Sequence, residues 1–235
     1  MPGYILHLVS VHMLLERLPA ESPYRTDPQM RNELYVGSLL PDAAVPKTVS
    51  HFYDPAFRDR MIIWPRPEVF RRKYRDRMSD PICLGYYYHL CIDKKFLQEY
   101  LPGVAEYYDR LGRPTEIKDD VSEVLLKRSG ERIPREKYLS DEYYYGDYTK
   151  MNTYLCERYQ IPEDLMLDRD SGIEETKNAD IESVFRQMRA YRKVPAEAAE
   201  DVRVFDVEGL LDFFERAASE TAAALGKVWL RKIWI

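Results

Sequence analysis

The stretch of sequence that decides the fold is Asp80-Pro81-Ile82-Cys83-Leu84-Gly85-Tyr86-Tyr87-Tyr88-His89-Leu90-Cys91-Ile92-Asp93-Lys94-Lys95-Phe96. Ser79 or Asp80 can cap a helix and Pro81 suits the first position of a helix, so the apolar run that follows is expected to be helical. On a helical wheel, Lys94 and Lys95 mark the solvent side. His89 and Asp93 lie on the opposite side and are therefore predicted to point into the core.

Burying an ionised carboxylate costs several kcal/mol unless it is compensated, so the buried His89 and Asp93 need an explanation. One explanation is a divalent cation bound by both side chains. The other is an i,i+4 hydrogen-bonded pair, closed by an Arg or Tyr from elsewhere in the chain. This helix alone leaves both alternatives open.

Length and composition favour one domain over residues 1–235. The chain has 235 residues, and no internal repeat or Pro/Gly/Ser-rich linker divides it. Its 35 basic and 40 acidic residues are mixed along the chain and give a net charge of -5. This pattern gives no basic footprint for a nucleic-acid duplex or an anionic membrane surface.

The chain shows no secretory signal pattern, and no apolar run reaches the ~20 residues that a transmembrane helix needs. We therefore expect a cytoplasmic protein without a transmembrane segment. The three cysteines are an odd number, and Cys83 and Cys91 are too far apart on one helix to form a disulfide. All three are interpreted as packing residues.

A first helix is predicted over residues 4–18, with a buried leucine and valine stripe and with Ser10 facing water. His7 falls within the apolar stripe, whereas His12 lies at its edge beside Glu16. A histidine on an apolar face is more commonly a packed core residue than a metal ligand. His7 is nevertheless kept as a candidate metal ligand, and His12 ranks below it.

Two further candidate ligands follow a second helix, which begins at Asp27-Pro28. Pro41 disfavours a helical conformation for Leu40, so the helix is expected to break there and leave Asp42 at a corner. Asp42 could instead be an ordinary turn former or helix cap. His51 lies in residues 43–64, which are predicted to be mostly loop, and could equally be a surface histidine.

The rest of the chain shows no convincing strand pattern, so the fold class is predicted to be all-α. Further helices are expected over 67–77, 104–111, 119–128, 141–159, 180–192 and 206–227. The helix at 141–159 should be interrupted near Gly146, and its tyrosines could pack in the core or line a substrate pocket. The apolar tail 228–235 is expected to dock or to meet a partner.

Three motifs stand in order along the chain: an early histidine, Gly37-Ser38-Leu39-Leu40-Pro41-Asp42 followed by Ser50-His51-Phe52, and the His-x-x-x-Asp pair of residues 89 and 93. This order and spacing resemble the zinc-dependent phospholipase C family, including short bacterial relatives. The resemblance covers about the first 100 residues well and implies an all-helical fold. It also implies one metal on Asp42, His51, His89 and Asp93, and a second metal shared by His7 and Asp93.

The donor types agree with this assignment, since two imidazoles and two carboxylates suit zinc or another first-row divalent metal. The chain also departs from the family. The phospholipases have a further His/His/Glu cluster, whereas here no histidine follows His89.

The resemblance leads to two functional hypotheses. The first is a metal-dependent hydrolase of a small phosphoester or lipid head group, with a metal-activated water as nucleophile. Lys47 and Tyr88 would support the ligands, and Asp54 or Asp147 could be the general base. The second is a non-catalytic protein whose metal staples helices together and whose aromatic face binds a lipid, nucleotide or protein partner.

Overall fold

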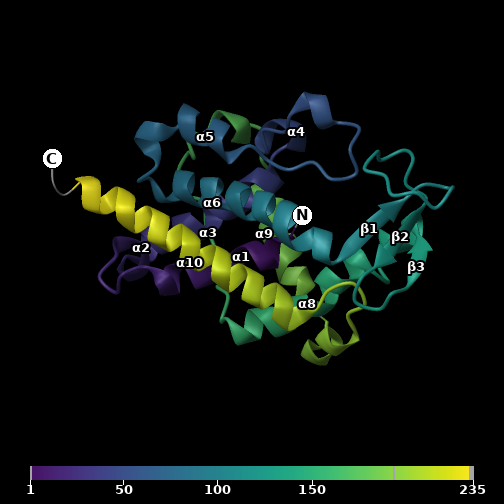
Figure 1. The fold of residues 1–235 in the computed structure, drawn as a ribbon. Coiled ribbons are helices and arrows are strands. Elements are labelled where there is room, and N and C mark those ends of the chain that lie inside the picture. The colour runs from purple at the N-terminus through teal and green to yellow at the C-terminus, as the bar shows by residue number, and fades with distance from the viewer. Residues whose placement is uncertain (1, 193, 233–235) are drawn as a thin grey trace.

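The computed structural model describes residues 2–192 and 194–232, with side chains described as far as Leu225, and it is mainly helical (Figure 1). Its α-helices are α1 (Tyr4–Arg17), α2 (Pro23–Thr26), α3 (Pro28–Ala43), α4 (Lys47–Ser50), α5 (Pro67–Lys73), α6 (Pro81–Lys95), α7 (Arg135–Tyr138), α8 (Tyr144–Arg158), α9 (Ile181–Tyr191) and α10 (Val207–Lys232). The helical body holds α1, α3 and α6 together, and a small sheet projects from one end (Figure 1).

Aspartate caps fix the start of three helices at the predicted positions. Asp27 accepts hydrogen bonds from two backbone N–H groups of α3, Asp80 accepts one from Cys83 of α6, and Asp180 accepts one from Ser183 of α9. Each carboxylate satisfies N–H groups that lack a partner inside the helix and lies at the positive end of the helix dipole. Local sequence signals therefore place the helices that carry Asp42, His89 and Asp93.

Two glycines let the backbones of α3 and α6 come into direct contact. A Cβ on Gly37 would lie 2.2 Å from the carbonyl oxygen of Ile82, and a Cβ on Gly85 would lie 2.2 Å from that of Leu34. Both neighbours are backbone atoms, which cannot rotate away as a side chain can. The close approach brings the C-terminal end of α3, which carries Asp42, against the face of α6 that carries His89.

The all-α prediction is wrong for residues 105–134. Strands β1 (Ala105–Tyr108), β2 (Glu123–Leu126) and β3 (Arg132–Pro134) form an antiparallel sheet in the order β1-β2-β3. Helices were predicted over 104–111 and 119–128. The strands are too short to show a clear alternation, and Gly112 and Gly130 occupy positive-φ positions in the two connections.

Three local predictions in the helical body are also wrong. Pro41 does not end α3, because the hydrogen-bond pattern resumes when Ala44 N–H donates to the Leu40 carbonyl, 3.2 Å away. No interruption occurs at Gly146, which lies inside α8. Ser10 is buried, and its hydroxyl is 2.8 Å from that of Tyr88.

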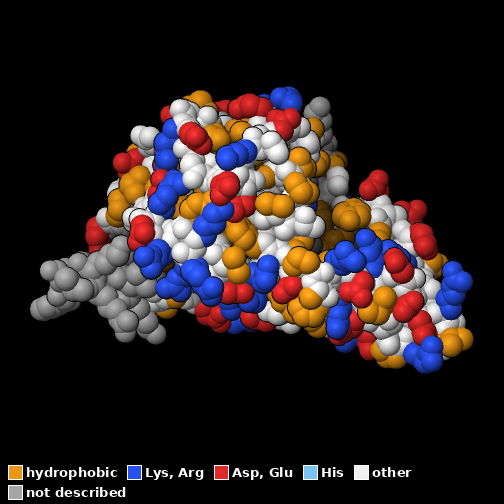
Figure 2. Space-filling view, turned by 90° about the horizontal axis from the view of Figure 1, so that it is seen from above, with side chains coloured by type: hydrophobic (Ala, Val, Ile, Leu, Met, Phe, Trp, Pro, Cys, Tyr) orange, Lys and Arg blue, Asp and Glu red, His pale blue; other side chains and the backbone are white. Residues whose placement is uncertain are grey.

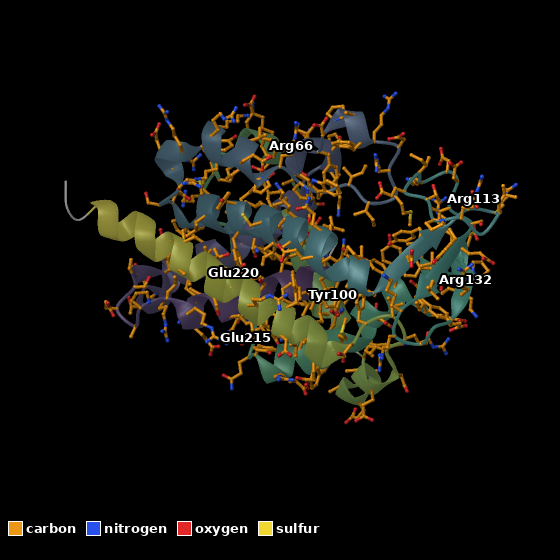
Figure 3. The ribbon with its side chains drawn as sticks, viewed as in Figure 1. Arg66, Tyr100, Arg113, Arg132, Glu215 and Glu220 are labelled. Atoms are coloured by element: carbon orange, nitrogen blue, oxygen red, sulfur yellow. The ribbon has the colours of Figure 1, made fainter. Side chains whose placement is uncertain are left out.

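The long helix α10 packs against α1 (Figure 1). Its apolar face includes Phe213 and Phe214, which are buried. Exposed ion pairs from Glu215 to Arg17 of α1 and from Glu220 to Lys95 of α6 flank the contact, and both glutamates are labelled in Figure 3. The predicted docking of the tail 228–235 concerns side chains outside the described residues.

Acidic and basic side chains are interspersed over the face seen in Figure 2, as the mixed charge order along the chain predicts. Within the described part of the chain, no helix combines the length and apolarity that crossing a bilayer requires.

Candidate metal centre

The structure brings all the predicted ligands together in one buried cluster. His7 comes from α1, Asp42 from the last turn of α3, His51 directly follows α4, and His89 and Asp93 come from α6. No member of the cluster is more than 8% exposed. His12 lies elsewhere on α1, where its Nε2 is 3.4 Å from the exposed carboxylate of Glu16.

His51 is oriented by the serine that precedes it. The Ser50 hydroxyl donates to the Pro41 carbonyl at 2.8 Å, so its oxygen is free to accept a hydrogen bond from His51 Nδ1, 3.0 Å away. This arrangement puts the ring proton of neutral His51 on Nδ1. The lone pair of Nε2 then points into the cluster.

His89 is oriented in the same sense by the backbone of α3. Its Nδ1 lies 2.7 Å from the carbonyl oxygen of Ser38, which can only accept, so Nδ1 carries a proton. The Nε2 atoms of His89 and His51 are 3.2 Å apart. With both rings neutral, two lone pairs face each other, an arrangement that requires a cation or a proton between them.

Carboxylate oxygens complete this group of acceptors. Asp93 Oδ2 lies 3.4 Å from His51 Nε2 and 3.5 Å from His89 Nε2, and Asp42 Oδ1 lies 3.5 Å from His51 Nε2. Donor atoms around a tetrahedral zinc ion at ~2.0–2.1 Å are about 3.3–3.4 Å from one another. The separations among His51, His89 and Asp93 are close to these values, whereas Asp42 approaches them only at His51. The distances therefore suit a first-row divalent ion on His51, His89 and Asp93, with Asp42 beside it.

A second group shares Asp93 and extends to α1. His7 Nε2 lies 3.3 Å from Asp93 Oδ1, and the rings of His7 and His89 stack with centroids 3.8 Å apart. His7 Nε2 and both carboxylate oxygens of Asp93 are buried without a hydrogen-bond partner. Such atoms are costly to bury unless something else binds them, and a metal ion would do so.

Electrostatics sets the protonation of the cluster. Burial, followed by the repulsion of His89, lowers the pKa of His7 to about 4, so this ring is neutral at pH 7 and can donate a lone pair. Burial acts against the charged forms of Asp93 and His89 as well. The mutual attraction of these two groups outweighs it, lowering the pKa of Asp93 well below its usual value and raising that of His89.

The hydrogen-bonded alternative accounts for many of the same atoms. A protonated His89 would neutralise Asp93, as its raised pKa allows, and would place a proton between the two Nε2 atoms. A neutral His7 with its proton on Nε2 would direct this N–H at Asp93 Oδ1, 3.3 Å away, and a small adjustment would complete the hydrogen bond that the two atoms now lack. The metal content of the purified protein decides between the two arrangements.

Lys47 lies at the outer edge of the cluster, as predicted. Its Nζ is 2.7 Å from Asp42 Oδ1. Burial disfavours the ammonium, but Asp42 outweighs this effect and raises the pKa of Lys47, which therefore stays charged. The Lys47 side chain is 46% exposed, so its cation faces outward as well as toward Asp42.

A cavity of about 470 Å³ adjoins this edge. Asp42 and Lys47 line it on one side, and tyrosines dominate the rest of its wall: Tyr4, Tyr144, Tyr145, Tyr148 and Tyr191. Asp42 thus belongs to both the candidate metal centre and the cavity. Three of these tyrosines come from the segment 141–159, whose aromatic side chains both pack and line this pocket.

The structure does not support the predicted roles of Asp147 and Asp54 as general base or of Tyr88 as a support for the ligands. Asp147 is not a free base, because its buried carboxylate accepts hydrogen bonds from the backbone N–H groups of Arg203, Val204 and Phe205. Asp54 caps a short turn and pairs with Arg66 at 3.2 Å. Tyr88 bonds to Ser10 rather than to a candidate ligand.

Sequence reasoning missed the two residues that orient the histidines, Ser38 and Ser50. Ser38 acts through its backbone carbonyl, which any residue would supply, so no side-chain signal marks it. Ser50 directly precedes His51, and this adjacency was a usable signal.

No family model, curated protein or solved structure matches this chain.

Proposed function

We propose that this chain is a metal-dependent hydrolase of a small phosphoester. Zinc or another first-row divalent metal would be held by Asp42, His51, His89 and Asp93, with His7 and Asp93 supporting a second ion. The single observation that carries the proposal is the convergence of acceptor atoms at 3.2–3.5 Å beside the cavity that Asp42 and Lys47 line. A metal at this place would supply an activated water and polarise a phosphoryl oxygen.

The residues of this chain would bind and orient the ester. The Lys47 ammonium, fixed by Asp42, offers a point charge for a phosphate oxygen at the boundary between cavity and cluster. The tyrosine wall would contact the remainder of the substrate, such as a lipid head group or an aromatic leaving group.

A second candidate function is a metal that only staples helices together. The burial of the ligands favours it, since His7, His51, His89 and Asp93 are at most 1% exposed. These ligands come from α1, α6 and the turn after α4, so bound metal ions would link segments that are far apart in the sequence.

The deciding experiment measures metal content and hydrolysis in the same preparations. Bis(p-nitrophenyl) phosphate, p-nitrophenyl phosphate and a short-chain phosphatidylcholine serve as substrates. Asp93→Asn should lose both metal and activity. Lys47→Met should keep its metal and lose at least about 10-fold in kcat/KM, since it removes only the proposed phosphate contact.

His12→Ala is the matched control and should change neither quantity. Bound metal with no hydrolysis of any of these esters, together with a Tm that falls in chelator, would assign the cluster to the stapling role. Metal-free protein with unchanged Tm in chelator would contradict both candidates.

A further inference from the structure

A second cavity lies between the helical body and the sheet, and none of the candidate metal ligands lines it. Its volume is about 720 Å³, within the range of small-molecule sites. Four separate parts of the chain form its walls: residues 60–64, residues 97–102 beyond the end of α6, β1 with the connection that follows it, and Lys127 directly after β2. A hollow between the body and the sheet, bordered by hydrophobic side chains, is visible in Figure 2.

The floor of this cavity is apolar, and the uncharged polar residues Gln98, Tyr107 and Thr115 contribute to its walls. Leu97, Leu101 and Ala105 are at most 6% exposed and form the floor, and Met61 and Trp64 are partly buried on the wall. Met61 adds a flexible, polarisable side chain that adapts to the shape of an apolar ligand.

Charged residues occur only at the exposed rim of the cavity lining, and they form two pairs. Arg60 pairs with Glu116, and Lys127 Nζ lies 4.0 Å from Glu106 Oε2. Each of these side chains is at least 37% exposed. The rim therefore carries two positive and two negative charges that neutralise one another, which leaves no net charge to attract an ionic ligand.

The walls are held in place without a ligand. Met61 N–H donates to the Glu116 carbonyl at 2.7 Å, and Lys118 N–H donates to the Asp59 carbonyl at 2.8 Å. These bonds tie the segment 59–61 to the connection between β1 and β2. A preformed cavity avoids the entropy cost of ordering its walls when a ligand binds.

The floor includes a widened helical turn. The end of α6 continues as a π-helical segment, η3 (Phe96–Tyr100), and as a 3₁₀ turn, η4 (Leu101–Gly103). Such π-helical turns are uncommon and occur frequently at functional sites. Leu97, Gln98 and Leu101 of these turns face the cavity.

We propose that this cavity binds an uncharged apolar small molecule of the alkyl-chain class, at a site separate from the candidate metal centre. The apolar floor, the self-neutralised rim and the preformed walls support an uncharged ligand over a fatty acid or a phosphate-bearing lipid.

The test is a fluorescence titration of the purified chain with the neutral probe N-phenyl-1-naphthylamine. We expect saturable binding that 1-decanol displaces at least 10-fold more effectively than decanoate. Met61→Lys, which puts a charge on the partly buried wall, should weaken probe binding at least 10-fold. Leu111→Lys is the matched control, because Leu111 is 74% exposed and lies outside the cavity, and it should bind as the wild type does.

Ile62→Lys provides a second variant on the same wall, and thermal melts show that each variant is folded. Unchanged probe binding in both wall variants would overturn the proposal, as would equal displacement by decanol and decanoate. Size-exclusion chromatography that shows a wild-type dimer, converted to a monomer by Met61→Lys, would instead assign the cavity to a second copy of the chain.

Discussion

At the scale of single residues, the groups that hydrogen-bond to His51 and His89 decide which ring nitrogen faces the cluster. Histidine and aspartate at the spacing of one helical turn are detectable in the sequence, and all the predicted ligands meet in space. The proton positions are not detectable. They depend on the Ser38 carbonyl and the Ser50 hydroxyl, which only the folded chain brings to the rings of His89 and His51.

The contribution of His7 can be separated from that of the other histidine of α1. His7→Ala should weaken zinc affinity by at least about 10-fold, because it removes a neutral imidazole next to the unpartnered Asp93 oxygen. His12→Ala should leave the affinity unchanged, since His12 faces Glu16 outside the cluster. Competition titration with a zinc chelator measures both variants. A larger loss for His12→Ala would show that the wrong face of α1 is assigned to the site.

At the scale of elements, helix starts were predictable where an aspartate cap precedes an apolar stripe, as at α3, α6 and α9, and α1 was predictable from its stripe alone. The sheet was not, because its strands are only three or four residues long and carry charged side chains. Its pairing is decided by long-range contacts that override local propensity. The glycines at its connections were the available signal, since Gly112 and Gly130 have positive φ.

The close contact of α3 with α6 leads to a stability prediction. Gly85→Ala should lower the free energy of unfolding by about 2 kcal/mol or more, because its Cβ would lie 2.2 Å from the Leu34 carbonyl oxygen and the backbones must separate. Gly103→Ala is the control, because nothing lies within 4 Å of its Cβ. Urea denaturation of both variants tests this, and equal midpoints would argue against a tight helix contact.

At the scale of the whole molecule, the segment between α8 and α9 ties together helices that are distant in the sequence. Arg169 donates to both carboxylate oxygens of Glu33 on α3, each at 2.8 Å, and to Asp80 at the start of α6 at 3.1 Å. The sequence predicted a loop over 168–178 but gave no sign of this clamp, since its partners lie 136 and 89 residues away. The same two helices carry Asp42, His89 and Asp93.

The Arg169 clamp should make stability depend on pH. The hydrogen bond from Arg169 lowers the pKa of Glu33, and Arg169 also outweighs burial to lower that of Asp80. A carboxyl whose pKa is lowered in the folded state stabilises that state above its unfolded pKa, and this stabilisation is lost as pH falls through the folded pKa. Arg169→Leu should therefore lower the free energy of unfolding by about 1–2 kcal/mol at pH 7. This range allows for solvent screening of Arg169, whose side chain is 35% exposed.

The difference between wild type and Arg169→Leu should shrink as both carboxyls protonate, below the ordinary glutamate pKa of ~4.3. Urea denaturation at pH 7 and at pH 3.5 measures this difference, which removes any acid effect common to both proteins. Arg75→Leu is the control, since Arg75 and its partner Asp76 are 78% and 90% exposed, and it should change stability by less than ~0.5 kcal/mol. A cost of Arg169→Leu that stays the same at both pH values would mean that Arg169 stabilises the fold through packing of its stem, not through the charges of Glu33 and Asp80.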